Sequence, residues 1–412
     1  MRPATTTDTP PNSTPASISI PLLKERCQVG LLRRLVCKLT PLGETLGRGT
    51  SGSVTQHMAT LEGDPCAEPT TVVVAVKQHD FSVAALVEGV TGCVLQRLAT
   101  HIPPHLQPHA NTIAWIHQAV FNPATYSMST ISISGAVGDV ATLLPAIRGG
   151  LGFFAAPACF VSTCLSLVSA ARLLAAGGIS HNDIKPGNVI VTAWQPGTQL
   201  PRQVALVDFA SAFFYGGPVT VLSGVPRTTR HTCSPAYPGP CKDPVATTAF
   251  ALGIVMCNLL AGEEYATMGA SIFAHHHPGN EERTFTRAHA LLKLATCMAL
   301  GGTQADTPDK VAAQVLTTFP DLACKYTLAT WAARATGHPA TATKITAFLA
   351  AVLQVVVALV DMNTQFAAAT GHAPPCTLLD DVVAMPLFTD PTLCEFSVCT
   401  PDPTPLACAC VG

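Results

Sequence analysis

The chain has 412 residues, of which 12% are charged and 48% hydrophobic, and its formal net charge at pH 7 is −2. This length suits one two-lobed unit or two domains with a sizeable core, and the near-neutral charge excludes electrostatic binding to nucleic acid or to an anionic membrane. The opening MRPATTTDTPPNSTPASIS lacks the apolar centre of a secretory signal and is typical of a disordered Thr/Pro tail.

Sixteen cysteines are scattered along the chain and form no pair of C-x-x-C knuckles, the spacing typical of zinc sites. We therefore expect reduced thiols in an intracellular protein of the cytoplasm or nucleus. Four cysteines lie near the end of the chain, at Cys394, Cys399, Cys408 and Cys410. They could bind a metal or accept a lipid, but a flexible Cys-containing tail is the preferred interpretation.

Residues 42–77 alternate glycine-rich and β-branched segments, TLGRGTSGSV and then TVVVAVK, with LEGDPCAEP between them. This pattern predicts two antiparallel strands joined by an enlarged loop. Apolar residues in 81–98 fall on one helical face, which predicts a helix with Glu88 on its polar side.

Helical segments dominate past residue 143. The longest apolar run, residues 345–360, is shorter than the ~20 residues that a membrane span needs, so it predicts a buried helix. A small strand-rich half therefore precedes a larger helical half, and we expect an α+β protein without a membrane span.

The glycine-rich segment Gly47-Arg48-Gly49-Thr50-Ser51-Gly52-Ser53-Val54 predicts a strand-turn-strand whose backbone can approach phosphate oxygens closely, because no Cβ intervenes at the glycines. A dinucleotide-binding fingerprint would need a helix directly after it, whereas a strand-like segment follows. An ordinary glycine-rich hairpin remains the alternative. Lys77, at the end of the next strand, could hold phosphates if Glu88 orients it.

The stretch GGISHNDIKPGNVIV carries a second group of polar residues. Its two glycines are expected to end the preceding helix as a C-cap, so the polar residues fall in a loop before an apolar strand, where catalytic groups are commonly placed. Asp183 could orient a hydroxyl, Asn188 could coordinate Mg²⁺, and Lys185 could neutralise a phosphoryl group. Asp208, after the strand-like run VALV, is a further candidate Mg²⁺ ligand.

Taken in order, these motifs resemble those of the eukaryotic-type protein kinase family over residues 42–388. LGRGTSGSV is similar to the glycine-rich phosphate loop, VAVK to the third-strand lysine motif, HNDIKPGN to the catalytic loop and DFA to D-F-G. Glu88 is similar to the C-helix glutamate. Farther on, SPAYPGP resembles the segment that ends in A-P-E, with Tyr237 and Pro240 in register, TAFALGIVMCNLLAG the following helix, and DDVVAMPLF the closing segment.

This resemblance implies a two-lobed protein kinase-like fold, with a small lobe at 41–140 and a helical lobe at 141–390, between tails at 1–40 and 391–412. It implies ATP and Mg²⁺ as cofactors and phosphoryl transfer to serine or threonine hydroxyls of protein substrates. The implied catalytic residues are Asp183, as base for the hydroxyl proton, Lys185 at the γ-phosphate, and the pair Lys77 and Glu88. The implied metal ligands are Asn188 and Asp208. The implied nucleotide-binding residues are Leu46, Gly47, Arg48, Gly49, Thr50, Ser51, Gly52, Ser53, Val54, Ala75 and Lys77.

Five positions depart from the family pattern. Asn182 replaces the arginine before the catalytic aspartate, so we do not expect control by phosphorylation of the activation segment. Ala210 replaces the D-F-G glycine and is expected to bias Asp208 toward one orientation. Cys241 and Thr248 replace acidic residues, so two polar ties of the larger lobe are expected to be missing, and Gln365 stands where an arginine is usual.

These departures leave two alternatives open. The chain could be a catalytically impaired pseudokinase that binds nucleotide or acts as a scaffold, or a small-molecule phosphotransferase, against which the glycine loop, VAVK and SPAYPGP argue. The Ala-, Thr- and Pro-rich divergence suggests a viral, herpesvirus-like source and hence a host-cell location. The hinge that would meet adenine is expected within residues 129–139.

Overall fold

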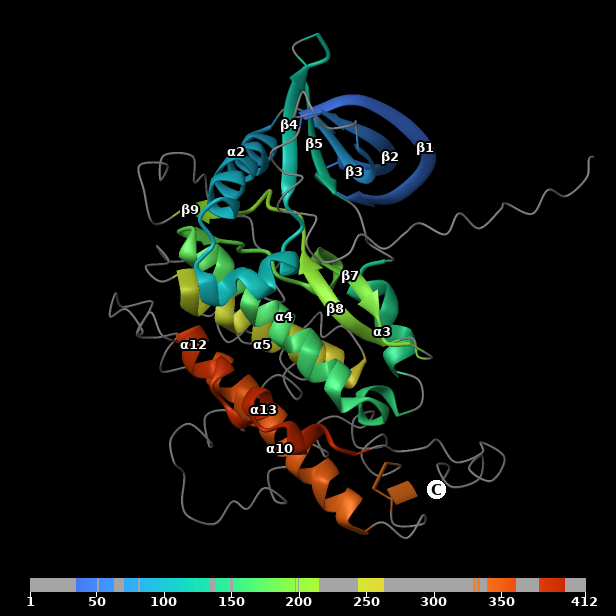
Figure 1. Cartoon of the computed structure of the whole chain (residues 1–412), viewed down its shortest axis with the longest axis vertical. Coiled ribbons are helices and arrows are strands. Elements are labelled where there is room, and N and C mark those ends of the chain that lie inside the picture. The colour runs from blue at the N-terminus through green and yellow to red at the C-terminus, as the bar shows by residue number, and fades with distance from the viewer. Residues whose placement is uncertain are drawn as a thin grey trace, which may run out of the picture.

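The computed structural model describes residues 35–49, 52–62, 70–80, 82–122, 124–133, 138–148, 151–196, 198, 200–214, 244–262, 329–330, 332–333, 339–360 and 378–396. A small lobe with a five-stranded antiparallel sheet and one long helix stands on a larger, mainly helical lobe (Figure 1). The predicted α+β class, with a small β-rich lobe followed by a larger helical lobe, is confirmed.

The sheet of the small lobe has the strand order β1-β2-β3-β5-β4. Its strands are β1 (Leu35–Gly49), β2 (Gly52–Glu62), β3 (Thr70–Asp80), β4 (Ile116–Asn122) and β5 (Ser127–Ile133). The antiparallel β2 and β3 are the two strands predicted from the glycine-rich and β-branched segments. Alternate residues of β3 are buried, as expected for β-branched side chains on one face of a sheet.

The sheet is strongly curled, as the long curve of β1 in Figure 1 shows. The Val36 amide near the start of β1 donates a hydrogen bond to Gln118 Oε1 on β4, 3.4 Å away, so the two edge strands meet at this point. The curl encloses a small apolar core of its own, separate from that of the larger lobe. This core consists of Ala59, Leu61, Val72, Val74, Val76 and Ile131.

Helix α2 (Val83–Ala99) packs on β4 and β5 of this sheet. Ser82 caps its N-terminus, since the Ser82 hydroxyl accepts a hydrogen bond from the Ala85 amide. The helix lies close to the sheet because Gly89 and Gly92 face it, and a Cβ at Gly92 would lie only 2.7 Å from the side chain of Ile116. Because α2 lies so close to the sheet, its side chains can contact those of β3.

The larger lobe is built around the long helix α4 (Pro157–Ala176), which packs on α5 (Pro244–Ala261). The other helices of this lobe are α3 (Val140–Arg148), α10 (Pro339–Val360), α12 (Leu378–Val383) and α13 (Pro386–Thr389), with 3-10 turns η1 (Pro104–Thr112), η2 (Gly152–Ala155), η3 (Pro186–Asn188) and η7 (Pro391–Cys394). Phe160 and Phe348 meet edge to face in the core, with ring centroids 6.0 Å apart. Helix α10 confirms the buried helix predicted for residues 345–360.

Among the residues that the structure describes, α4 is long and apolar enough to cross a membrane, with a mean hydropathy of 1.7. Two-thirds of the apolar window of α4 is nevertheless buried inside the protein. It packs there against η1, α5 and the strand β8 (Pro201–Leu206). The helix therefore serves as the core of the larger lobe.

Two short strand pairs line the junction between the lobes. The strand β6 (Ile179–Ser180) pairs with β9 (Phe213–Phe214), and β7 (Val189–Trp194) pairs with β8. The chain that leads into β4 joins this region, because the Ala114 amide donates to the Leu206 carbonyl over 2.9 Å. The chain that leads into α3 joins it as well, because the Val191 amide on β7 donates to the Gly138 carbonyl, also over 2.9 Å.

The structure differs from the predicted lobe boundaries at both ends. Strand β1 begins at Leu35 rather than at residue 41, since pairing with β2 extends it toward the N-terminus. At the other end, η7 continues the fold past residue 390, and Phe396 packs on Phe348 with ring centroids 5.7 Å apart. Of the predicted tails at 1–40 and 391–412, residues 1–34 and 397–412 lie outside the described residues.

Candidate active site

The loop that carries Asp183 starts where α4 ends. Gly177 is the C-cap, and Gly178 adopts a positive φ of 67°, a conformation that glycine takes without strain. The Gly178 amide donates to the Ala175 carbonyl over 2.9 Å. This agrees with the predicted helix stop and turns the chain directly into β6 and the polar loop.

His181 is fully buried at the start of this loop and joins it to the segment that carries Asp208. Its Nε2 donates to the Val207 carbonyl over 2.9 Å, while its Nδ1 accepts from the Asp183 amide over 3.3 Å. These partners require the neutral ring with its proton on Nε2, and burial lowers the pKa of His181. His181 therefore holds the two segments together. The sequence motif contains this histidine but did not predict its role.

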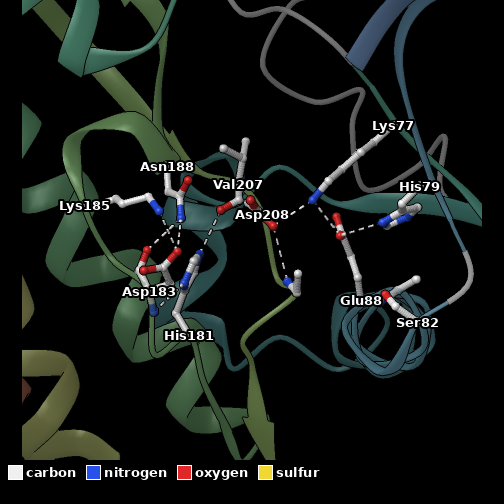
Figure 2. Close-up of polar contacts among 12 residues, drawn as sticks. Lys77, His79, Ser82, Glu88, His181, Asp183, Lys185, Asn188, Val207 and Asp208 are labelled. Atoms are coloured by element: carbon white, nitrogen blue, oxygen red, sulfur yellow. Dashed lines mark hydrogen bonds and ion pairs between the residues drawn. The ribbon is translucent and has the colours of Figure 1, made fainter. Parts of the chain in front are cut away.

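Asp183, Lys185 and Asn188 form one cluster (Figure 2). Asp183 Oδ2 accepts hydrogen bonds from Lys185 Nζ at 2.9 Å and from Asn188 Nδ2 at 3.0 Å. Asn188 Nδ2 also donates to the Asp183 carbonyl over 2.8 Å. Because these contacts use the amide nitrogen of Asn188, its amide oxygen is the atom suited to a metal ion.

Lys77, Glu88 and Asp208 form a second cluster beside the first, as Figure 2 shows. Lys77 Nζ lies 2.7 Å from Glu88 Oε2 and 2.7 Å from Asp208 Oδ1. The structure therefore brings together a lysine from β3, a glutamate from α2 and an aspartate from the segment after β8. Of the two contacts that Lys77 makes, the sequence predicts the one with Glu88.

The charges in this second cluster perturb one another strongly. Burial alone would lower the pKa of Lys77, but the charges of Glu88 and Asp208 together raise it. Burial would raise the pKa of Asp208, but the nearby ammonium group of Lys77 lowers it. For Glu88, burial outweighs the attraction of Lys77 and raises the pKa to about 6.

The predicted environment of Glu88 is wrong, since the sequence places it on the polar side of its helix and the structure leaves it only 3% exposed. The reason is the close approach of α2 to the sheet at Gly89 and Gly92, which presses the adjoining Glu88 against β3. The helix period identifies an apolar face, but it does not show how far the sheet wraps around that face.

Replacement of Glu88 by Gln is expected to stabilise the fold at the expense of the site. Burial raises the pKa of Glu88 from 4.5 to about 6, so the folded protein binds this proton more tightly than the unfolded chain. The resulting stability is complete below pH 4.5 and is lost as the pH rises through about 6, and the difference corresponds to about 2 kcal/mol. In urea titrations, Glu88→Gln should exceed the wild type by about this amount at pH 8 and match it near pH 4. If the two proteins differed in unfolding free energy by the same amount at both pH values, Glu88 would not be a buried charge in the folded wild type.

Asp208 lies in the left-handed region, with a φ of 63°, directly after Val207. The Ala210 amide donates to Asp208 Oδ1 over 3.4 Å, and the same oxygen accepts from Lys77. A short polar side chain is the non-glycine type that best tolerates this backbone. The hydrogen bonds from Lys77 and Ala210 hold the Asp208 carboxylate toward Lys77, even though Ala210 stands where the family pattern has a glycine.

The glycine-rich segment forms a hairpin between β1 and β2, with Gly47 opposite Val54 and Gly49 opposite Gly52. Val54 also pairs with Lys77 on β3, so these two side chains share a face of the sheet, and Ala75 lies on that face two residues before Lys77. Leu46 and Arg48 lie on β1 and Ser53 on β2. Two predicted binding residues, Thr50 and Ser51, lie outside the described residues.

Gly52 and Gly47 provide a matched pair of substitutions in this hairpin. Gly52 has a φ of 137°, and a Cβ there would lie 2.1 Å from the Gln78 carbonyl oxygen, whereas a Cβ at Gly47 would meet nothing within 4 Å. We expect Gly52→Ala to lower the melting temperature clearly and Gly47→Ala to leave it nearly unchanged, because only the first change forces backbone atoms apart. Equal melting temperatures for the two variants would show that the hairpin is not held against Gln78.

Asn182 and Thr248 correct one expectation from the sequence. Ser180 Oγ lies 3.1 Å from Thr248 Oγ1 and donates to Asn182 Oδ1 over 2.8 Å, while Asn182 Nδ2 donates to the Ser211 carbonyl over 3.3 Å. The polar tie expected to be missing at Thr248 is therefore present as a chain of uncharged hydrogen bonds. Cys241, Tyr237, Pro240 and Gln365 lie outside the described residues.

Asn182 also carries backbone strain that a pair of variants can separate from its hydrogen bonds. Its φ is 60°, which costs most non-glycine residues about 1–2 kcal/mol. Asn182→Ala is expected to lose about 2–3 kcal/mol of unfolding free energy, from the strain and the lost hydrogen bonds, and Asn182→Gly about 1 kcal/mol. Chemical denaturation of both variants measures this difference, and identical losses would contradict the strain.

The donors at the junction fit Mg²⁺ in type. The Asp208 carboxylate and the Asn188 amide offer hard oxygen ligands, and Mg²⁺ is commonly held by one or two such groups together with substrate phosphates. Within the described part of the chain, no group of three or more His, Cys, Asp or Glu side chains could hold a metal ion by itself. Of the predicted hinge region, residues 129–133 and 138–139 are described, and its register stays a prediction.

No protein-family model matches the chain, and no curated protein matches it. Among solved structures, it is similar to a chain of the CAK complex from Chaetomium thermophilum bound to ATP-γ-S. The two chains are 13% identical, with a TM-score of 0.47, and the match covers 87% of this chain and 92% of that chain.

Proposed function

We propose that the protein is an ATP- and Mg²⁺-dependent kinase that transfers a phosphoryl group to serine or threonine hydroxyls of proteins. The observation that carries the proposal is the contact of Lys77 Nζ with both Glu88 and Asp208, at 2.7 Å each. An ammonium group held between two carboxylates, next to an aspartate-lysine-asparagine cluster, suits phosphate binding and metal binding in one place.

In this proposal each side chain has one task. Lys77, oriented by Glu88, would bind the nucleotide phosphates, and the oxygens of Asp208 and Asn188 would hold the metal. Mg²⁺-ATP, when bound, supplies the phosphoryl group and neutralises charge that develops during its transfer.

Asp183 would accept the proton of the substrate hydroxyl as the oxygen attacks, and Lys185 would stabilise the transferring group. The hydrogen bonds from Lys185 and Asn188 to Asp183 Oδ2 support this role, because they fix the carboxylate against rotation. Positioning and charge neutralisation then account for most of the rate acceleration.

The proposal also covers the type of acceptor, the cellular location and the source of the protein. Lys185 within D-I-K-P-G-N supports serine and threonine acceptors by resemblance, and the scattered cysteines, which we expect to be reduced thiols, support an intracellular location. The divergent, Ala-, Thr- and Pro-rich sequence supports a viral, herpesvirus-like source.

The direct test is incubation of the full chain with Mg²⁺ and radiolabelled ATP in the presence of casein, followed by phosphoamino-acid analysis. We expect labelled phosphoserine or phosphothreonine. A panel of small hydroxyl compounds in place of casein separates protein kinase activity from small-molecule phosphotransfer. Labelling of the small compounds alone would overturn the protein-kinase assignment.

Asn182 and Ala210 favour a second candidate, a pseudokinase that binds nucleotide or acts as a scaffold without transferring phosphate. A thermal-shift titration with Mg²⁺-ATP distinguishes the possibilities, since a ligand that binds the folded state must raise its stability. Stabilisation together with casein labelling supports the kinase. Stabilisation without labelling, or neither effect, supports the second candidate.

A further inference from the structure

Gln96, near the C-terminal end of α2, joins this helix to the start of the neighbouring strand β4 (Figure 1). The Gln96 side-chain amide donates to the Ile116 carbonyl over 3.3 Å and also to the His117 carbonyl. Consecutive carbonyls of a regular strand point to opposite sides, so one amide could not reach both. Here the register of β4 with β5 shifts between Ile116 and Gln118, and this bulge turns both carbonyls toward Gln96.

The closest contact of α2 with β4 lies midway between Gln96 and Glu88. A Cβ at Gly92 would lie only 2.7 Å from the side chain of Ile116. Gln96 and Glu88 are each four residues from Gly92, in opposite directions, which is about 6 Å along the helix axis. A tilt of α2 about this contact would move Gln96 and Glu88 in opposite directions by similar amounts. Holding Gln96 on β4 therefore also limits the movement of Glu88.

The contact between Lys77 and Glu88 is sensitive to such a tilt. Lys77 Nζ lies 2.7 Å from Glu88 Oε2, and a lengthening by about 1 Å takes this contact beyond hydrogen-bond range. The cap at the other end of α2 does not restrain the tilt, because the Ser82 hydroxyl accepts from the Ala85 amide within the helix itself. The two hydrogen bonds of Gln96 instead connect the helix to the sheet, and hydrogen bonds fix direction as well as distance.

We propose that Gln96 is a positioning residue for nucleotide binding, which anchors α2 on the bulge of β4 and so holds Glu88 against Lys77. The inference rests on the proposed function, in which Lys77 binds the nucleotide phosphates. Gln96 acts through Glu88, so its loss should weaken phosphate binding. The transfer step, which depends on Asp183, should be largely unaffected once the nucleotide is bound.

The kinetic test compares the wild type with Gln96→Met, Gln96→Lys and a control, Arg97→Met, at an exposed neighbouring position of α2. Gln, Met and Lys have similar helix propensities, but Met removes the hydrogen-bond donor and Lys keeps one. We expect Gln96→Met to raise KM for ATP about tenfold and to change kcat by less than about twofold. Gln96→Lys should restore most of the affinity, and Arg97→Met should keep the wild-type KM. A wild-type KM in Gln96→Met, or an equally raised KM in Gln96→Lys, would overturn the inference.

A double variant separates positioning from a general loss of stability. In a Glu88→Gln background, Gln96→Met should raise KM no further, because the contact that Gln96 positions is already lost. A second tenfold rise in KM would mean that Gln96 does not act through Glu88, and the inference would fail. If Gln96→Met does not fold, Gln96→Asn, whose amide is one methylene shorter, provides the same comparison with a milder change.

A second measurement needs no nucleotide. Acetylation of the Lys77 amine by acetic anhydride is read by mass spectrometry, relative to Lys344, whose side chain is 42% exposed on α10. Burial alone would lower the pKa of Lys77, but its carboxylate partners raise it, so a loosened contact with Glu88 increases the share of reactive free amine. We expect Gln96→Met to raise the labelling of Lys77 about three- to tenfold and Arg97→Met to leave it unchanged.

The labelling result separates this inference from the proposed function. Unchanged labelling of Lys77 in Gln96→Met overturns the inference even if the protein is an active kinase. Raised labelling in a protein that transfers no phosphate supports the positioning of Lys77 by Gln96 and leaves the proposed function as the part that fails.

Discussion

Replacement of Asp183 by Asn is expected to lower kcat by about 10²–10⁴-fold, the usual contribution of a positioned base. The amide keeps one oxygen that can accept from Lys185 and Asn188, which lie 2.9 and 3.0 Å from Asp183 Oδ2. The loop should therefore keep its shape, while the group that takes up the hydroxyl proton is lost. Single-turnover phosphorylation of casein measures the effect without interference from product release.

The matched control for this substitution is Asp80→Asn, an exposed carboxylate at the end of β3. It changes the charge of the chain by the same amount at a position away from the loop. Stabilisation of Asp183→Asn by Mg²⁺-ATP should equal that of the wild type, since Asp183 is not proposed to hold the nucleotide. Phosphate transfer at the wild-type rate in Asp183→Asn would remove Asp183 from the role of base.

Replacement of Lys77 by Met is expected to lower kcat/KM for ATP by at least about 100-fold, because one ammonium group contacts Glu88 and Asp208 and is proposed to bind the phosphates. The substitution should also remove most of the thermal stabilisation by Mg²⁺-ATP. Methionine fills a volume similar to that of the lysine stem, so the packing around β3 is preserved. Wild-type affinity for Mg²⁺-ATP in Lys77→Met would contradict the proposed site.

Stability supplies a second readout for Lys77→Met. Removal of one partner from a buried ion pair typically costs about 3–5 kcal/mol, because a charge is left buried without compensation. Here the loss should be smaller at pH 5 than at pH 8, since burial already raises the pKa of Glu88 to about 6 and a proton can replace the lysine charge. The double variant Lys77→Met, Glu88→Gln should regain much of the stability at pH 8 and none of the activity.

Local sequence signals predict those parts of the fold that depend on neighbouring residues. The β-branched run of β3 and the helical period of α2 are readable because each element displays its own buried face. The start of β1 at Leu35 and the two-residue strands β6 and β9 carry no such signal. They exist because residues farther along the chain pair with them, Glu62 with Leu35 and Phe214 with Ile179.

The candidate site also has one part that the sequence predicts and one part that it does not. Asp183, Lys185 and Asn188 lie within one short loop, so their proximity follows from the sequence alone. The burial of Glu88 depends instead on how closely α2 approaches the sheet. That distance is set by two glycines that no helical period distinguishes from ordinary surface positions.

The hydrogen bond from Ala114 to Leu206 has a mechanical consequence for the two lobes. It fastens the chain between α2 and β4 to the strand that ends just before Asp208. The small lobe is thereby attached to the larger lobe two residues before Asp208. Asp208 in turn contacts Lys77 on β3, so a displacement of the small lobe against this strand would also change the contact that holds the Lys77 ammonium group.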